Sequence, residues 1–216
     1  MGARSRGRAR RKHRAADVRI HPGTAISHRD TETQRVATER QVALLRGINV
    51  GKAKRVAMAE LRALVEELGF TDVKTLLNSG NVVYTATDTV PEDAASRIEE
   101  ALRARTGVSS RVTVLTAAEV ADALDANPFA PVDDASRFLV AVLRDPADVV
   151  RLAPMAKEDW GSDEFAIGRR VAYLWCRGGI LESRLPEALQ RTLGDAATSR
   201  NLATMQKLRT LTESPR

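Results

Sequence analysis

Val42-Ala43-Leu44-Leu45 runs directly into Arg46-Gly47-Ile48-Asn49-Val50-Gly51, and this stretch decides the fold. A short apolar run that ends in a glycine-bearing polar loop is typical of a buried strand. A second polar loop, Asn78-Ser79-Gly80-Asn81, separates two further predicted strands. Because α/β proteins place binding groups on short loops at strand ends, these two loops are the first candidates for a functional site.

The elements around these loops are predicted in the order β-α-β-β-α-β. The helix after the first loop carries apolar side chains on one face and charged side chains on the other. The next helix begins at Pro91 and ends before Gly107, residues that favour a first helical turn and a C-terminal cap. The predicted ranges are 42–46, 73–77, 81–85 and 111–115 for the strands and 58–68 and 91–107 for the helices.

A second set of elements repeats this order further along the chain. Thr116 and Glu119 have the spacing of a capping box, which predicts a linker helix as far as Leu124. The segment 127–131, Asn-Pro-Phe-Ala-Pro, then breaks the chain. The elements predicted after the break are strands at 138–143, 164–167, 171–176 and 197–200, helices that begin at 145 and 183, and a terminal helix at 202–211.

Together these sets predict an α+β protein with two ferredoxin-like (β-α-β-β-α-β) plait units in tandem. The first unit, with the linker helix, spans 41–135, and the second, with the C-terminal helix, spans 136–216. Tyr173 and Trp175 alternate on one predicted strand, and Tyr84 lies on the corresponding strand of the first unit. We expect these rings to pack between the units, because the full motif for base stacking in RNA-binding plaits is absent.

The net positive charge of the chain lies in residues 1–40. The chain has a formal net charge of +6, and this segment holds 11 of the 34 Lys and Arg and 4 of the 28 Asp and Glu. The segment therefore carries +7 and the remainder −1. Its composition cannot bury enough apolar surface to fold alone, which predicts a disordered basic tail. The alternative is an arm that contacts nucleic acid through phosphates, although interleaved aromatic residues are missing.

Composition also excludes several kinds of site from the body of the chain. All three histidines lie in the first 40 residues, and Cys176 is the only cysteine. The body therefore cannot form a Ser-His-Asp or Cys-His nucleophile, a zinc site of soft ligands or a disulfide framework. Gly47 to Lys52 fails the phosphate-loop spacing, and no G-x-G-x-x-G occurs. We expect no metal and no cofactor, a cytoplasmic location, and no membrane partner, since no apolar run reaches about 18 residues.

A weaker anion site remains possible at the first loop. Arg46, Lys52, Lys54 and Arg55 precede the helix at Met58, whose free N–H groups favour a negative charge. Solvated basic residues without a ligand are the alternative. The polar side chains of the second loop likewise either bind a polar ligand or serve a tight turn.

Several motifs together resemble a known family. The matching stretches are 43–51 (ALLRGINVG), 58–62 (MAELR), 68–73 (LGFTDV), 79–83 (SGNVV), 127–129 (NPF), 183–185 (SRL) and 199–201 (SRN). They are similar to the family titled domain of unknown function 1697, over about residues 41–212. The resemblance implies a duplicated plait-like α+β fold and supplies no reaction, ligand or cofactor. The chain departs from the family pattern at Lys52, Ala57, Asn78 and Leu202, so no exact ligand specificity is carried over.

The polar residues shared with the family form the candidate site: Arg46, Asn49, Ser79, Asn81, Arg200 and Asn201. The leading hypothesis is that they bind a polar or anionic small ligand through the strand-end loops, without catalysis. A second hypothesis is an enzyme of unknown reaction in which Arg46 or Arg200 stabilises developing negative charge. A third is nucleic-acid contact through the basic tail. The site requires Arg46 and Arg200 to come together in the folded chain.

Overall fold

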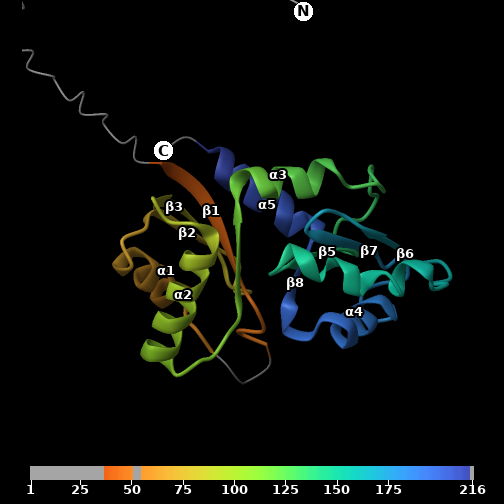
Figure 1. Ribbon diagram of the computed structural model, residues 1–216, viewed down its shortest axis with the longest axis horizontal. Coiled ribbons are helices and arrows are strands. Elements are labelled where there is room, and N and C mark those ends of the chain that lie inside the picture. Colours follow the sequence, from red (N-terminus) through yellow and green to blue (C-terminus); the bar gives the residue numbers. More distant parts are fainter. Residues whose placement is uncertain (1–36, 51–54, 215–216) are drawn as a thin grey trace, which may run out of the picture. The chain divides into compact units, whose positions relative to one another are not determined.

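Two four-stranded antiparallel sheets form the framework of the computed structural model, which describes residues 37–50 and 55–214 (Figure 1). The described residues belong to one compact unit. The strand order is β2-β3-β1-β4 in the first sheet and β6-β7-β5-β8 in the second. The predicted α+β class is therefore confirmed. The strands are β1 (Thr38–Leu45), β2 (Thr71–Leu76), β3 (Asn81–Thr87), β4 (Val112–Thr116), β5 (Phe138–Leu143), β6 (Glu164–Ile167), β7 (Val171–Trp175) and β8 (Ala197–Asn201).

The first half consists of β1 to β4 with α1 (Met58–Glu67) and α2 (Pro91–Thr106), in the predicted order. Both helices cover one face of the first sheet, where Leu61 and Ile98 pack in the same core as Leu45 (Figure 1). As predicted, α2 begins at a proline and ends at Gly107, which has a left-handed φ of 69°. Local capping rules therefore set both ends of this helix.

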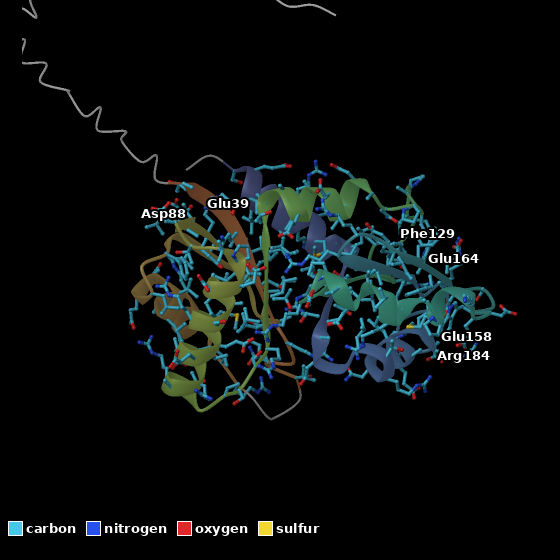
Figure 2. All side chains as sticks on the ribbon, in the orientation of Figure 1. Glu39, Asp88, Phe129, Glu158, Glu164 and Arg184 are labelled. Atoms are coloured by element: carbon cyan, nitrogen blue, oxygen red, sulfur yellow. The ribbon has the colours of Figure 1, made fainter. Side chains whose placement is uncertain are left out.

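The first strand begins earlier than predicted. Residues 38–40 pair with residues 85–87 of β3. Ala37 and Asp88 also exchange two hydrogen bonds of 2.9 Å at this end of the sheet, where Figure 2 labels Glu39 and Asp88. The tail boundary after residue 40 therefore falls inside a strand and has to move to residue 37 or earlier. The rest of the predicted tail lies outside the described residues.

The second half consists of β5 to β8 with α4 (Leu185–Leu193), and it differs from the prediction in one element. Two short 3₁₀ helices, η1 (Pro146–Leu152) and η2 (Met155–Lys157), occupy the place of the α-helix predicted after Asp145. Pro154 lies between them and has no N–H, so an α-helix through this position would lose a hydrogen bond. The α-helix predicted here was wrong. A third short 3₁₀ helix, η3 (Gly194–Ala196), precedes β8.

The other faces of the two sheets contribute to one shared core, together with α3 (Ala117–Asp125) and α5 (Leu202–Glu213). Val42 and Leu44 of β1 lie in this core with Val140 of β5. The linker helix α3 starts with the predicted capping box. Thr116 Oγ1 accepts from the Glu119 N–H at 3.1 Å, and Glu119 Oε2 accepts from the Thr116 N–H at 2.9 Å.

The aromatic residues divide between two cores. Tyr173 and Trp175 lie in the shared core, as predicted. Tyr84 faces α1 and α2 instead, with its ring centroid 4.5 Å from that of Phe70, so the prediction for Tyr84 was wrong. Successive side chains of a strand point to opposite faces, and in β3 it is Val83 that reaches the shared core.

Candidate functional site

Arg200 of β8 is only 9% exposed, and its guanidinium group reaches the first half. Its Nη2 donates to the carbonyl oxygens of Leu45 at 2.7 Å and Ser79 at 2.9 Å, and its Nε donates to the side-chain oxygen of Asn81. Its Nη1 donates to the Ser199 carbonyl at 2.9 Å. Every guanidinium nitrogen thus has a protein acceptor. The residue joins the end of β1 and the β2–β3 turn to the second half.

The charge of Arg200 is held by neutral groups. Among its partners in the described part of the chain there is no carboxylate. Burial, with a smaller contribution from the positive charge of Arg46, lowers the pKa of Arg200 to about 10. The guanidinium therefore stays protonated at neutral pH, and carbonyl dipoles take the place of a counter-ion.

The β2–β3 turn is built around Asn81, which is fully buried. Its Nδ2 donates to the Leu76 carbonyl at 2.8 Å and to Ser79 Oγ at 3.0 Å. Gly80 has a φ of +78°, and a Cβ at this position would lie 2.7 Å from Ile48 Cδ1. Only glycine fits there, because the backbone conformation and the close approach of the first loop both exclude a side chain.

Asn49 holds the first loop closed. Its φ is 56°, a left-handed conformation that asparagine tolerates better than most residues. Its side chain donates to the carbonyls of Val56 at 2.9 Å and Asn78 at 2.8 Å, and it accepts from the Val56 N–H at 2.9 Å. Asn49 thus bridges the two ends of the segment 51–54. That segment contains Lys52 and Lys54 and lies outside the described residues.

Asn201 caps the N-terminus of α5. Its Oδ1 accepts from the Thr204 N–H at 2.9 Å and from the Thr204 hydroxyl at 2.6 Å. Five of the six candidate residues therefore use polar side-chain atoms in hydrogen bonds to other groups of the protein: Asn49, Ser79, Asn81, Arg200 and Asn201. Their roles in the fold explain these residue types, and ligand contact by them stays a prediction.

Arg46 reaches from the first half to the second, in the direction opposite to Arg200. Its Nε lies 3.3 Å from an Asp195 carboxylate oxygen, and its two terminal nitrogens donate to the Ala197 carbonyl and the Gln190 side chain. Its side chain remains 24% exposed. Of the six candidate residues, Arg46 alone lines a cleft of about 920 Å³ at the end of β1.

We call this cleft the arginine cleft, after the four arginines in its wall: Arg46, Arg103, Arg111 and Arg144. Three serine residues, at 96, 109 and 110, also line it, and its acidic side chains are Glu99, Glu100 and Asp195. The Ser110 hydroxyl contacts the first loop, accepting from the Arg46 N–H at 3.1 Å. The cleft therefore collects guanidinium and hydroxyl donors at one end of the first sheet.

Glu99 of α2 organises the cleft. Its Oε1 accepts from the Val112 N–H at 2.8 Å and from Arg144 Nη1 at 2.9 Å, and its Oε2 lies 3.3 Å from Arg111 Nη1. Its side chain is 18% exposed. Arg103 has no carboxylate partner among the described residues, and it is exposed. The cleft thus holds one guanidinium free of an ion pair and three that are paired to acidic side chains.

Three of these four arginines, Arg103, Arg111 and Arg144, were not predicted as site residues, because no sequence motif contains them. The one available signal was position, since Arg144 directly follows a buried strand just as Arg46 does. The cleft forms only in the folded chain, where the ends of β1 and β5 lie near α2 and the start of β4.

Comparisons with known proteins identify relatives of this chain. The model of the family described as Protein of unknown function (DUF1697) matches residues 38–173. The solved structure of conserved bacterial protein SP0830 from Streptococcus pneumoniae matches with a TM-score of 0.70 and 22% sequence identity. The match covers 82% of this chain and 100% of that one, and it shows a shared fold. No curated protein matched in sequence.

The described residues also lack two other features. None of their helices combines the length and the apolar character that crossing a bilayer requires. In the same residues, no group of three or more His, Cys, Asp and Glu side chains is arranged to hold a metal ion.

Proposed function

This chain belongs to the family described as Protein of unknown function (DUF1697), and we propose that it binds a polar or anionic small ligand in the arginine cleft. The observation that carries the proposal is the gathering of Arg46, Arg103, Arg111 and Arg144 around one cleft. Planar guanidinium groups match the geometry of carboxylates and phosphates, which they bind through paired hydrogen bonds.

The charges of the cleft support an anion over a neutral ligand. Four arginines face three acidic side chains, and Arg103 makes no ion pair in the described chain. The hydroxyls of Ser96 and Ser110 already donate to backbone carbonyl oxygens, so Ser109 is the serine that can donate to a further oxygen of the same ligand. An anion that reaches Arg103 and also competes with Glu99 or Asp195 for a second arginine would be held by at least two guanidinium groups.

In this proposal three of the six candidate residues have one of two roles, ligand contact or positioning. Arg46 contacts the ligand, because it lines the cleft and is partly exposed. Arg200 and Asn49 are positioning residues, which fix the carbonyl end of β1 and the first loop. Their conservative replacement should change ligand affinity only through the placement of Arg46.

A thermal-shift screen tests the proposal with phosphate, pyrophosphate, citrate and nucleotides. A ligand at about 100 times its Kd adds about 2.7 kcal/mol, which raises Tm by about 5–10 °C for a chain of this size. Arg103→Ala should abolish the shift. Arg62→Ala is the matched control, because Arg62 lies on α1 and pairs with Glu66 outside the cleft.

Two outcomes would contradict the proposal. One is the absence of any shift across the anions while the protein shows a cooperative melt. The other is a shift that survives both Arg103→Ala and Arg144→Ala, since the ligand would then bind elsewhere.

We further propose that each half is a ferredoxin-like plait and that the halves correspond to the two predicted units, with the first beginning at the start of β1 instead of at residue 41 and the second spanning 136–216. The equivalent strand orders β2-β3-β1-β4 and β6-β7-β5-β8 support this. A cytoplasmic location is also proposed, supported by the use of a single cysteine, Cys176, which is fully buried.

A further inference from the structure

The outer edge of β4 has a gap in its hydrogen bonding. The Arg46 N–H donates to the Arg111 carbonyl, so alternation along β4 turns the backbone groups of Val112 and Val114 away from β1. Glu99 accepts from the Val112 N–H, and Arg170 donates to the Val114 carbonyl at 3.2 Å. Within the described residues nothing bonds the Val112 carbonyl or the Val114 N–H. One acceptor and one donor thus remain free between two capped positions.

A second cleft, of about 400 Å³, lies along this free edge. Residues 112–114 form one wall, Pro146 and Arg170 lie in the rest of it, and Arg144 belongs to both clefts. The side chains of Val112 and Val114 are buried in the core of the first half. The second cleft therefore meets the backbone edge of β4, with the first turns of α2 on its other side, and it shares Ser96 and Arg144 with the arginine cleft.

Glu99 shows which chemistry this junction binds. Its carboxylate takes one backbone N–H of the strand edge and two guanidinium groups, those of Arg111 and Arg144. A strand that paired antiparallel with β4 would place a carbonyl oxygen of its own at the Val112 N–H. If that strand ended there, this oxygen would belong to its terminal carboxylate, in the position that the Glu99 carboxylate occupies.

We infer that the chain binds the free carboxyl terminus of an extended peptide as an added strand on β4, and that Glu99 occupies the carboxylate position until the peptide displaces it. The terminal residue pairs with Val112, donating its N–H to the Val112 carbonyl. The carbonyl two residues earlier accepts from the Val114 N–H. Arg170 ends the pairing because it holds the Val114 carbonyl. Backbone and terminal charge carry the recognition, as in other cases of strand addition.

The inference rests on the proposed function, because the terminal carboxylate would bind Arg111 and Arg144, two of the four arginines of the same cleft. It adds the chemical class of the ligand. The protein binds three groups of the peptide at the same time: the terminal carboxylate, the last N–H and one earlier carbonyl.

Three forms of one peptide test the inference with the unaltered full chain. The probe is a tetra-alanine with a fluorescent group at its N-terminus and a free carboxyl terminus, measured by fluorescence anisotropy. Its C-terminal amide should bind at least about 10-fold more weakly, because a charged hydrogen-bond acceptor is lost. An ester in place of the last peptide bond removes the N–H that donates to Val112, and should weaken binding by about 5-fold.

Glu99→Ala tests the displacement step. This variant should bind the free peptide at least about 5-fold more tightly, since no internal carboxylate competes. Glu60→Ala is the matched control, because Glu60 is an exposed residue of α1 outside both clefts and its loss changes the net charge by the same amount. It should change the affinity by less than about 2-fold. If circular dichroism shows that Glu99→Ala does not fold, Glu99→Gln is used in its place. The three peptides test the inference in either case, because they are measured with the unaltered chain.

Phosphate, titrated into the same proteins, separates the two proposals. Equal binding of the acid, amide and ester peptides overturns the strand-edge inference. If phosphate still binds and Arg103→Ala abolishes that binding, the proposed function stands alone. If neither phosphate nor peptide binds the folded protein, both proposals fail.

Discussion

Replacing Arg200 with alanine should cost the protein about 3–5 kcal/mol of its free energy of unfolding. The variant loses five hydrogen bonds and leaves their acceptor oxygens in a buried site; the acceptors belong to Leu45, Ser79, Gly80, Asn81 and Ser199. A hydrogen bond from a charged donor contributes about 1.5–3 kcal/mol. These losses are partly offset, because the variant no longer buries a charge.

The offset can be sized from the acid–base equilibrium of the guanidinium. Burial holds the pKa of Arg200 at about 10 against an ordinary 12.5. A pKa difference of this size corresponds to about 3 kcal/mol of penalty on the charged form. The hydrogen bonds exceed that penalty even at the low end of their range. The expected net loss agrees with the usual cost of breaking a buried charged network.

Urea unfolding at pH 7 measures this loss, with the fluorescence of Trp160 and Trp175 as the signal. The free energy of unfolding of Arg200→Lys should lie between those of the parent protein and Arg200→Ala, since one ammonium group cannot reach all five acceptor oxygens. Arg191→Ala is the control. Arg191 pairs with Glu187 at 3.0 Å on the exposed face of α4, and its loss should cost less than about 0.5 kcal/mol. A loss below about 1 kcal/mol for Arg200→Ala would refute the reasoning.

Three further predictions concern single residues. Gly80→Ala should lower the free energy of unfolding by about 2–4 kcal/mol, because a left-handed φ and a contact of 2.7 Å with Ile48 both oppose a Cβ; a urea midpoint equal to that of the parent would contradict this. Thr116→Ala should cost about 1 kcal/mol through the loss of the α3 cap, and Thr116→Ser should restore most of it in the same assay. Burial raises the pKa of the Cys176 thiol, so the unfolded chain releases this proton at a lower pH than the folded chain. Stability should therefore fall as the pH rises from about 8 to 10, and Cys176→Ala should flatten that fall; parallel pH profiles would count against it.

The polar loops illustrate how far sequence alone reaches. Asn49, Ser79 and Asn81 were identified as special, and the structure gives each a specific set of hydrogen bonds. The sequence could not show whether a ligand or the backbone receives those bonds, because amide and hydroxyl groups serve both in the same way. Here the backbone receives them.

The regular elements were predictable where short-range rules decide them. β5 has the predicted bounds, Phe138–Leu143, and the capping box at Thr116 starts α3 as expected. The 3₁₀ segment after Asp145 was not predictable from its apolar residues, because they suit either type of helix and Pro154 acts only late in the segment. The arginine cleft depended on contacts between residues far apart in sequence, which no local pattern encodes.

The shared core has a consequence for synthesis on the ribosome. Val42, Leu44 and Val83 of the first sheet share this core with Met205 and Leu208 of α5, the element that is translated last in the described chain. When the first half leaves the ribosome, one apolar face of its sheet is therefore still incompletely covered. This face is fully covered only after almost all of the remaining chain, including α5, has been synthesised. Folding that depends on such distant contacts is slow, and exposed apolar sheet favours aggregation in the interval. The nascent chain should need chaperone protection until α5 has left the exit tunnel.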